Sequence, residues 1–217
     1  MFTFFRTLQP NLQRMKAVRR IHFLALLIPL ASTMLSCSNP QPQATILLTQ
    51  AEQLMDSHPD SAILLIDSIF YPGKSFSKKD YMRYWVARVQ VRYKNHLPVK
   101  EDTLIFAAKD YFTAHGRNPK QAALACFYSG CVCRERGDFQ QAMQHYKDAG
   151  TFASKTNDVE MKGLIQYNIG DLLATQGLYS KALHNYQQAE EFYTQSPNKA
   201  KEKQTLCLSD RPDASII

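Results

Sequence analysis

Apolar residues in the second half of the chain recur at helical intervals. Ala142, Tyr146, Ala149 and Ala153 are spaced three or four residues apart, which places them on one face of a helix. The preceding segment, residues 122–136, has a similar spacing and is followed by glycine, the residue that most often ends a helix. The pattern therefore predicts two helices joined by a tight turn.

This helix pair occurs twice, at an offset of forty residues. The stretch "GDFQQAMQHYKDAG" corresponds to the later stretch "GLYSKALHNYQQAE". A glycine inside a helix costs about 1 kcal/mol relative to alanine, so a glycine that recurs there indicates close approach of the partner helix, with the tyrosine filling the space beside it. The matched positions carry identical residues: Gly130 and Gly170, Gly137 and Gly177, Ala142 and Ala182, Tyr146 and Tyr186, and Ala149 and Ala189.

The first half of the chain has the same organisation in a weaker form. The segments "SKKDYMRYWVARVQVRYKN" and "EDTLIFAAKDYFTAHG" predict a further helix pair. Before them, "TILLTQAEQLMDSHPDSAILLIDSIF" predicts two short helices that divide at residues 58–59, with Asp60 or Ser61 as the second N-cap. The chain is thus expected to be all-α, with about four helix pairs: degenerate repeats over 44–116 and two clear repeats over 119–195.

The two clear copies resemble the tetratricopeptide repeat (TPR), whose pattern combines a glycine, an alanine, an aromatic residue and a second alanine at fixed spacing. Gly130, Ala142, Tyr146 and Ala149 fit this pattern, as do their equivalents forty residues later. The copies depart from it in their period, since a TPR usually has about 34 residues, and in lacking its opening tryptophan. The resemblance implies an α-solenoid of TPR-like helix pairs that binds a protein or peptide along the wall formed by the first helix of each pair.

The resemblance also implies which residues line that wall. Phe127 and Tyr167 stand where some family members carry part of a carboxylate clamp, so the surface is expected to suit an apolar or aromatic partner. The alternative is that Phe127 and Tyr167 only pack against the neighbouring repeat. The candidate groove residues carried over from the family are Leu124, Phe127, Cys131, Arg134, Leu164, Tyr167 and Asp171.

The positive charge is concentrated at the N-terminus. The chain has 217 residues and a net charge of +7, but residues 1–37 hold five basic and no acidic side chains, which leaves 7 − 5 = +2 on the rest. The stretch "RYWVARVQVRYKN" mixes basic and aromatic residues, yet a helix with its arginines outward explains it equally well. Without a sustained basic face, nucleic-acid binding is not expected.

The N-terminal segment has the layout of a secretory signal peptide. From Met15, "MKAVRRIHFLALLIPLASTMLSC" combines a basic head, an apolar run and a small residue before Cys37. Its last four residues resemble the lipobox of bacterial lipoproteins, which implies that residues 1–37 are a signal peptide and that Cys37 carries a lipid such as palmitate. Residues 38–43 would form a polar tether. An uncleaved anchor, or a cysteine that merely ends a signal sequence, is the alternative. Met15 is a more natural start of translation than Met1.

The sequence contains no recognisable catalytic constellation. It has no phosphate-binding glycine loop, no nucleophile elbow and no zinc-binding helix motif. Cys126, Cys131 and Cys133 are expected to be buried thiols rather than metal ligands. The histidines, His145 included, are expected on connections and outer helix faces, and carboxylates such as Asp102 in caps or exposed positions. We therefore expect neither an enzyme nor a bound cofactor or metal.

The tail, residues 196–217, is polar and has no helical apolar stripe. It favours a shortened version of a longer protein, and the chain also resembles the sensor half of longer bacterial TPR-containing signalling or transcription regulators. Taken together, the sequence predicts a TPR lipoprotein of a Gram-negative bacterium, lipid-anchored in the cell envelope with its repeats facing the periplasm, that mediates protein–protein interaction as a scaffold or adaptor. The alternative is a truncated sensor of the regulator type.

Overall fold

The computed structural model describes residues 42–115 and 118–196. The predicted signal peptide, Cys37 and the tail from residue 197 lie outside these described residues. Helices make up the described part of the chain, and it contains no strand. In chain order they are α2 (Pro42–Leu54), α3 (Pro59–Asp67), α4 (Pro72–Ser75), α5 (Lys78–Lys94), α6 (Leu104–His115), α7 (Pro119–Glu135), α8 (Phe139–Ala153), α9 (Val159–Thr175) and α10 (Tyr179–Thr194).

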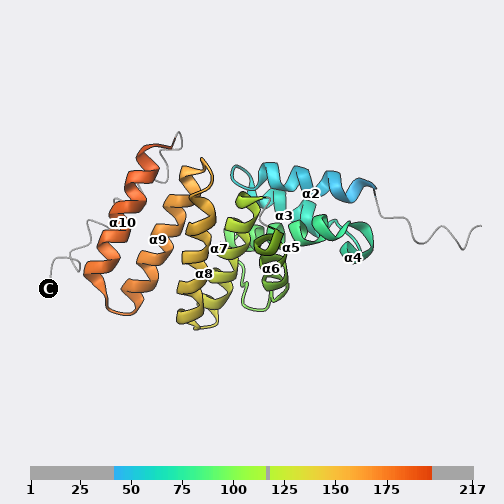
Figure 1. Ribbon diagram of the computed structural model, residues 1–217. Helices are drawn as coiled ribbons and strands as arrows, with labels where there is room; N and C mark the ends of the chain where they lie inside the picture. The colour runs from blue at the N-terminus through green and yellow to red at the C-terminus, as the bar shows by residue number, and fades with distance from the viewer. Residues whose placement is uncertain (1–41, 116–117, 197–217) are drawn as a thin grey trace, which may run out of the picture. The chain divides into compact units, whose positions relative to one another are not determined.

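The longer helices form the four predicted pairs, α2 with α3, α5 with α6, α7 with α8, and α9 with α10. Each pair packs against the next, so that neighbours in the sequence are neighbours in space (Figure 1). The first helices of the first three pairs also contact one another in series, α2 with α5 and α5 with α7. The all-helical solenoid expected from the repeat pattern is therefore confirmed.

Local sequence signals set the ends of the repeat helices. The side chains of Asn118, Asp138 and Asp158 accept hydrogen bonds from backbone amides three residues later, at 3.0–3.1 Å, and so cap α7, α8 and α9. Gly137 and Gly177 follow α7 and α9 with φ of +79° and +75°. That left-handed conformation suits glycine, and it lets the amides beyond each helix bond back to its last carbonyls.

Two boundaries differ from the prediction. The N-cap of α3 is His58, not Asp60 or Ser61, because Pro59 occupies the first helical position, where its fixed φ and missing amide N–H are favourable. Helix α2 begins at Pro42, so the last residues of the predicted 38–43 tether are helical.

The recurring glycines and tyrosines meet as predicted. A Cβ atom added to Gly130 would lie 2.5 Å from the ring of Tyr146, and one added to Gly170 would lie 2.7 Å from the ring of Tyr186. Real Cβ atoms do not approach other atoms this closely, so each tyrosine ring occupies the space that a side chain would need. The repeat signature therefore describes helix packing within a pair.

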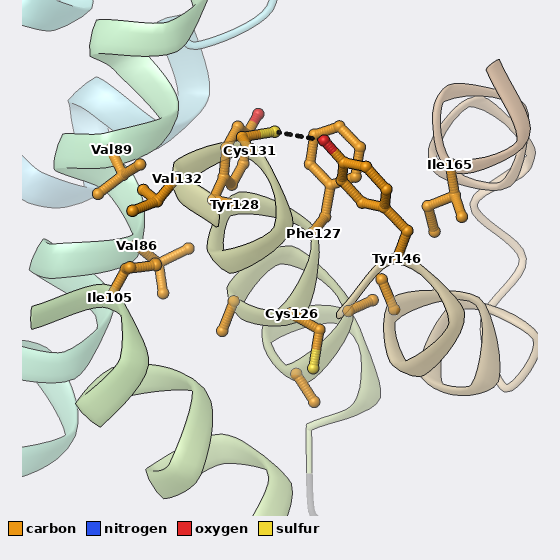
Figure 2. Packing of buried hydrophobic residues seen from close by; sticks show 14 of the residues in the cluster. Val86, Val89, Ile105, Cys126, Phe127, Tyr128, Cys131, Val132, Tyr146 and Ile165 are labelled. Atoms are coloured by element: carbon orange, nitrogen blue, oxygen red, sulfur yellow. Dashed lines mark hydrogen bonds between the residues drawn. The ribbon is translucent and has the colours of Figure 1, made fainter. Parts of the chain in front are cut away.

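The core consists of two hydrophobic clusters on either side of α5. Val86 and Val89 belong to the larger cluster, which extends through α7 to α9, whereas Ala87 and Val91 belong to the smaller cluster with α2 and α3. Figure 2 shows the larger cluster, in which α7 lies between the valines of α5 and the tyrosine of α8. Helix α5 is thus apolar on two faces.

Candidate binding groove

A cavity of about 530 Å³ opens among α5, α7, α9 and α10. Its apolar lining includes Leu164, Leu97 and Pro98, together with four tyrosines, Tyr93, Tyr128, Tyr167 and Tyr193. The connection after α5 completes the rim. A concave site lined by aromatic rings with a few polar groups has the usual make-up of a ligand or side-chain pocket.

A second cavity, of about 310 Å³, continues the first toward α2. Leu124 and Met161 give it apolar surface, and carboxylates from α2 and from the start of α9 surround them. Lys94, Tyr128 and Leu164 line both cavities. The two cavities therefore adjoin one another beside α2, α5, α7 and α9, the first helices of the four pairs, and we call them together the first-helix groove.

The groove has an excess of acidic side chains. Its lining holds five carboxylates and two lysines, 2 − 5 = −3 with its histidine neutral, and one of these carboxylates, Glu52, is paired with Arg83 outside the lining. Lys94 and Lys120 pair with Asp56 at 2.7 Å and with Asp158 at 4.0 Å, so each lysine is already engaged by a carboxylate of the groove. The aromatic end is thus followed by an acidic end.

The structure brings some of the predicted groove residues into the lining. Leu124, Leu164 and Tyr167 line the first-helix groove. Phe127 and Cys131 lie behind it and are buried. The ring of Phe127 packs 5.5 Å from that of Tyr146, so this side chain fills the interior of the repeat.

Arg134 and Asp171 form a polar network next to the groove. Arg134 Nη1 donates to Asp171 Oδ2 at 3.4 Å, and the hydroxyl of Tyr186 donates to Asp171 Oδ1 at 2.9 Å. These bonds connect α7, α9 and α10. The two residues therefore hold successive repeats in register.

Asn168 is a groove residue that sequence reasoning missed. It is buried, and its Oδ1 accepts hydrogen bonds from the Tyr93 hydroxyl at 3.3 Å and from Arg134 Nη1 at 3.2 Å, while its Nδ2 donates to the Leu164 carbonyl. It thereby links α5, α7 and α9. The available signal was that asparagine occupies the repeat position at which the previous copy has the buried Tyr128.

Two predicted surface residues are placed differently from expectation. Asp102, at 12% side-chain exposure, pairs with Arg92 at 3.2 Å and with Arg88 at 3.7 Å, so it ties the start of α6 to α5. His145 is buried against the ring of Phe106 rather than on an outer face. Burial, together with the nearby Lys109, lowers the pKa of His145. Both contacts join segments that the helical pattern does not connect.

The three described cysteines are free and buried, as predicted. Burial raises the pKa of Cys126 and of Cys131 to about 12, so both thiols stay protonated near neutral pH. A protonated, inaccessible thiol is neither a nucleophile nor a metal ligand. Within residues 42–115 and 118–196, no group of histidine, cysteine and carboxylate side chains has the arrangement of a metal site.

The fold and groove define a protein of the TPR-like helical-repeat class. The crystal structure of the nearly identical TPR-like repeats of a Podosopora anserina protein described as a putative kinesin light chain superposes with a TM-score of 0.55 at 12% identity, covering 81% of this chain and 92% of that one. The crystal structure of a variant of the same repeats gives the same TM-score at 11% identity, with the same coverage of both chains. No curated protein matches the chain significantly.

Residues 92–209, more than half of the chain, match the family model described as "Soluble NSF attachment protein, SNAP", and the chain belongs to this family. The TPR-like fold suggests protein partners. Among the helices of the described part, none has the length and apolar character needed to cross a membrane.

Proposed function

We propose that this protein is a membrane-anchored scaffold or adaptor that holds a segment of a partner protein in the first-helix groove. The observation that carries the proposal is that two adjoining cavities, which share three lining residues, lie beside α2, α5, α7 and α9. Solenoids of helix pairs present such concave walls to extended or helical peptide segments.

The lining defines the chemistry of that segment. A tyrosine-rich cavity of about 530 Å³ accepts an apolar or aromatic side chain, whose burial contributes roughly 1.5–3 kcal/mol. The acidic end favours lysine or arginine over carboxylates. The proposed partner segment therefore carries an apolar anchor residue next to basic residues.

The groove proposal is tested by Tyr167→Ala, which removes a ring from the lining. The partner is captured by affinity from native membranes and then titrated. We expect its dissociation constant for the variant to be about tenfold larger than for wild type. The matched control is Tyr179→Ala, which removes an exposed ring at the start of α10, outside the groove lining. Undiminished binding by Tyr167→Ala would contradict the proposal.

A second variant separates recognition from folding. The carboxylate of Asp56 is exposed and meets Lys94 at the rim of the acidic cavity, so Asp56→Lys should leave the helical circular dichroism signal unchanged. Because it reverses a charge facing a basic partner segment, it should weaken binding most at low salt. If Asp56→Lys and wild type bind equally at all salt concentrations, the partner segment does not carry the proposed basic residues.

We further propose that Cys37 carries the lipid that attaches the protein to the envelope of a Gram-negative bacterium, with the repeats on the periplasmic side. The support is the basic head, apolar run and lipobox-like "MLSC" before a short polar stretch. In cells labelled with radioactive palmitate, the wild-type protein should incorporate label and Cys37→Ala should not. Label that persists in Cys37→Ala would exclude this residue as the lipid site.

A further inference from the structure

The connection between α3 and α5, which includes the short helix α4, exposes two adjacent aromatic side chains. Phe70 and Tyr71 are 62% and 77% exposed. Apolar residues on both sides of them point inward: Ile69 is in the core, and the ring of Phe76 packs 5.7 Å from that of Tyr84. The loop is therefore fixed to the core at both ends and holds two large rings in solvent.

Tyr71 adopts a backbone conformation that side chains rarely occupy. Its φ and ψ of 52° and 54° are left-handed, which costs a non-glycine residue roughly 1–2 kcal/mol. The backbone amides of Lys74 and Ser75 donate to its carbonyl at 2.8 and 3.1 Å, and the buried Ser75 hydroxyl donates to the Phe70 carbonyl at 3.0 Å. Strain that is stabilised in this way and that presents an exposed ring points to a use for the ring.

Basic side chains follow the two rings. Lys74, Lys78 and Lys79 are exposed, and the Lys74 ammonium lies 5.9 Å from the centre of the tyrosine ring. The carboxylates that flank the segment in the sequence, Asp67 and Asp80, form ion pairs with arginines of α5. The surface of residues 70–79, which we call the aromatic–basic loop, therefore combines exposed rings with positive charge.

We propose that the aromatic–basic loop docks on a layer of anionic lipid headgroups. Aromatic side chains with a polar edge are enriched at the level of the headgroups, and each lysine close to an anionic surface contributes about 1 kcal/mol. A protein partner of matching charge would need a complementary surface for rings that point into solvent, whereas a headgroup layer accommodates them without one. The lipid surface is therefore the occupant that these residues favour.

The position of the loop fits this role. Helix α4 packs against α2, at the end of the repeats where the described chain begins (Figure 1). Pro42, the first residue of α2, follows Cys37 by five residues, and five extended residues span at most about 18 Å. The inference thus rests on the proposed lipid at Cys37, which keeps α2 close to the bilayer. The loop adds a second contact that orients the first-helix groove relative to the membrane.

The test uses a fluorescent label placed inside the loop. Gly73→Cys provides the attachment point and retains both rings, because a Cβ atom at this position lies 3.9 Å from its nearest neighbour on Tyr81. Ser180→Cys, in the exposed start of α10, is the matched control. Both variants are made in the lipid-anchored full chain with Cys207→Ser. Because Cys126, Cys131 and Cys133 are buried, the label reacts at the introduced cysteine. The protein is reconstituted into vesicles of phosphatidylglycerol and phosphatidylethanolamine that contain headgroup spin-labelled lipid.

We expect about a twofold loss of fluorescence for the label at position 73 and none for the label at 180, because only a loop at the headgroup level meets the quencher. Combining Phe70→Ser with Tyr71→Gly should abolish the loss without unfolding, since both side chains are exposed and glycine suits the left-handed backbone. Replacing phosphatidylglycerol by phosphatidylcholine should reduce the loss.

Other outcomes separate this inference from the lipid anchor. A palmitate-labelled chain that floats with the vesicles, but whose label at 73 is no better quenched than that at 180, overturns the docking surface alone. If the label at position 73 is protected from solvent only in vesicles that contain membrane proteins, the loop binds a protein partner, and this result overturns the lipid assignment. A chain that takes up no palmitate and does not float overturns both proposals.

Discussion

The close contact between a glycine on one helix and a tyrosine on its partner is the smallest unit of this repeat. It occurs at Gly130 with Tyr146 and at Gly170 with Tyr186, and again at Gly163 with Tyr193, where a Cβ atom would lie 2.7 Å from the ring. The third contact is absent from the repeat signature. Its tyrosine lies near the end of α10, which it fixes against α9.

Gly130→Ala should destabilise the protein by about 1–3 kcal/mol, because the added methyl group overlaps the ring of Tyr146 and one of them must move. The matched control is Gly150→Ala, also within a helix, whose added Cβ atom would lie 3.9 Å from Ile165. That variant should be up to about 1 kcal/mol more stable than wild type, from helix propensity alone. Urea unfolding monitored by circular dichroism measures both. Equal shifts for the two variants would contradict the packing explanation.

The buried His145 makes stability depend on pH. Burial, followed by Lys109, lowers its pKa, whereas nearby carboxylates, Asp148 first among them, act in the opposite direction. Below about pH 6.5 the imidazole of His145 is therefore protonated more fully in the unfolded chain than in the folded chain. The free energy of unfolding falls as the pH decreases through that range.

His145→Gln should remove this part of the pH dependence. We expect wild type to lose more free energy of unfolding than the variant between about pH 7.5 and about pH 5.5, a window above the range in which ordinary carboxylates titrate. Urea unfolding of both proteins at the two values is the measurement. Parallel losses would assign the pH dependence to other groups.

At the scale of the helices, the two clear repeats differ in how their second helix begins. Asp138 caps α8 by accepting a hydrogen bond from the backbone amide of Gln141 at 3.1 Å, whereas Leu178, at the equivalent position before α10, provides no side-chain cap. Leu178 is also 41% exposed, so it contributes little burial. The start of α10 is therefore less well stabilised than that of α8.

Leu178→Asp should stabilise the protein by about 1 kcal/mol, since an aspartate accepts from the free amides of the first turn and interacts favourably with the helix dipole. Leu178→Ala is the control, because it removes the leucine without adding a cap and should change little. The free energy of unfolding is again the readout. A gain in the alanine variant equal to that in the aspartate variant would show that the cap has no part in it.

The helices could be predicted from sequence because their signals are local. Spacing of apolar residues located α5 to α10, and Gly137 and Gly177 located two turns. Contacts between helices were predictable only where the repeat duplicated them. Asp102 and His145 find their partners on other helices, and Asn168 joins three of them, so no pattern within one helix revealed their burial. The same limit applied to the groove. Phe127 follows the lining residue Leu124 by three positions, but its side chain is buried in the interior.

At the scale of the whole described array, α5 divides the core into two clusters. The smaller cluster contains α2 and α3 with one face of α5, and the larger contains α6 to α9 with the other face. In a solenoid each repeat is stabilised mainly by its neighbours, so stability can vary along the array. Among the described residues, the α2–α3 and α9–α10 pairs each have a neighbouring repeat on one side only, but α9 belongs to the larger cluster, whereas α2 and α3 belong to the smaller one. We therefore expect the α2–α3 pair to open before the others.

Leu48→Ala tests this expectation, because Leu48 is fully buried in the smaller cluster and its truncation should cost about 2–5 kcal/mol locally. Amide hydrogen exchange should become faster in α2 and α3 and stay unchanged in α8 to α10. The control, Ile105→Ala, removes a fully buried side chain from the larger cluster and should accelerate exchange in α6 and α7. If Leu48→Ala accelerates exchange along the whole array, the clusters unfold as one unit. In that case, opening of α2 would also unfold the repeats that form the aromatic end of the groove.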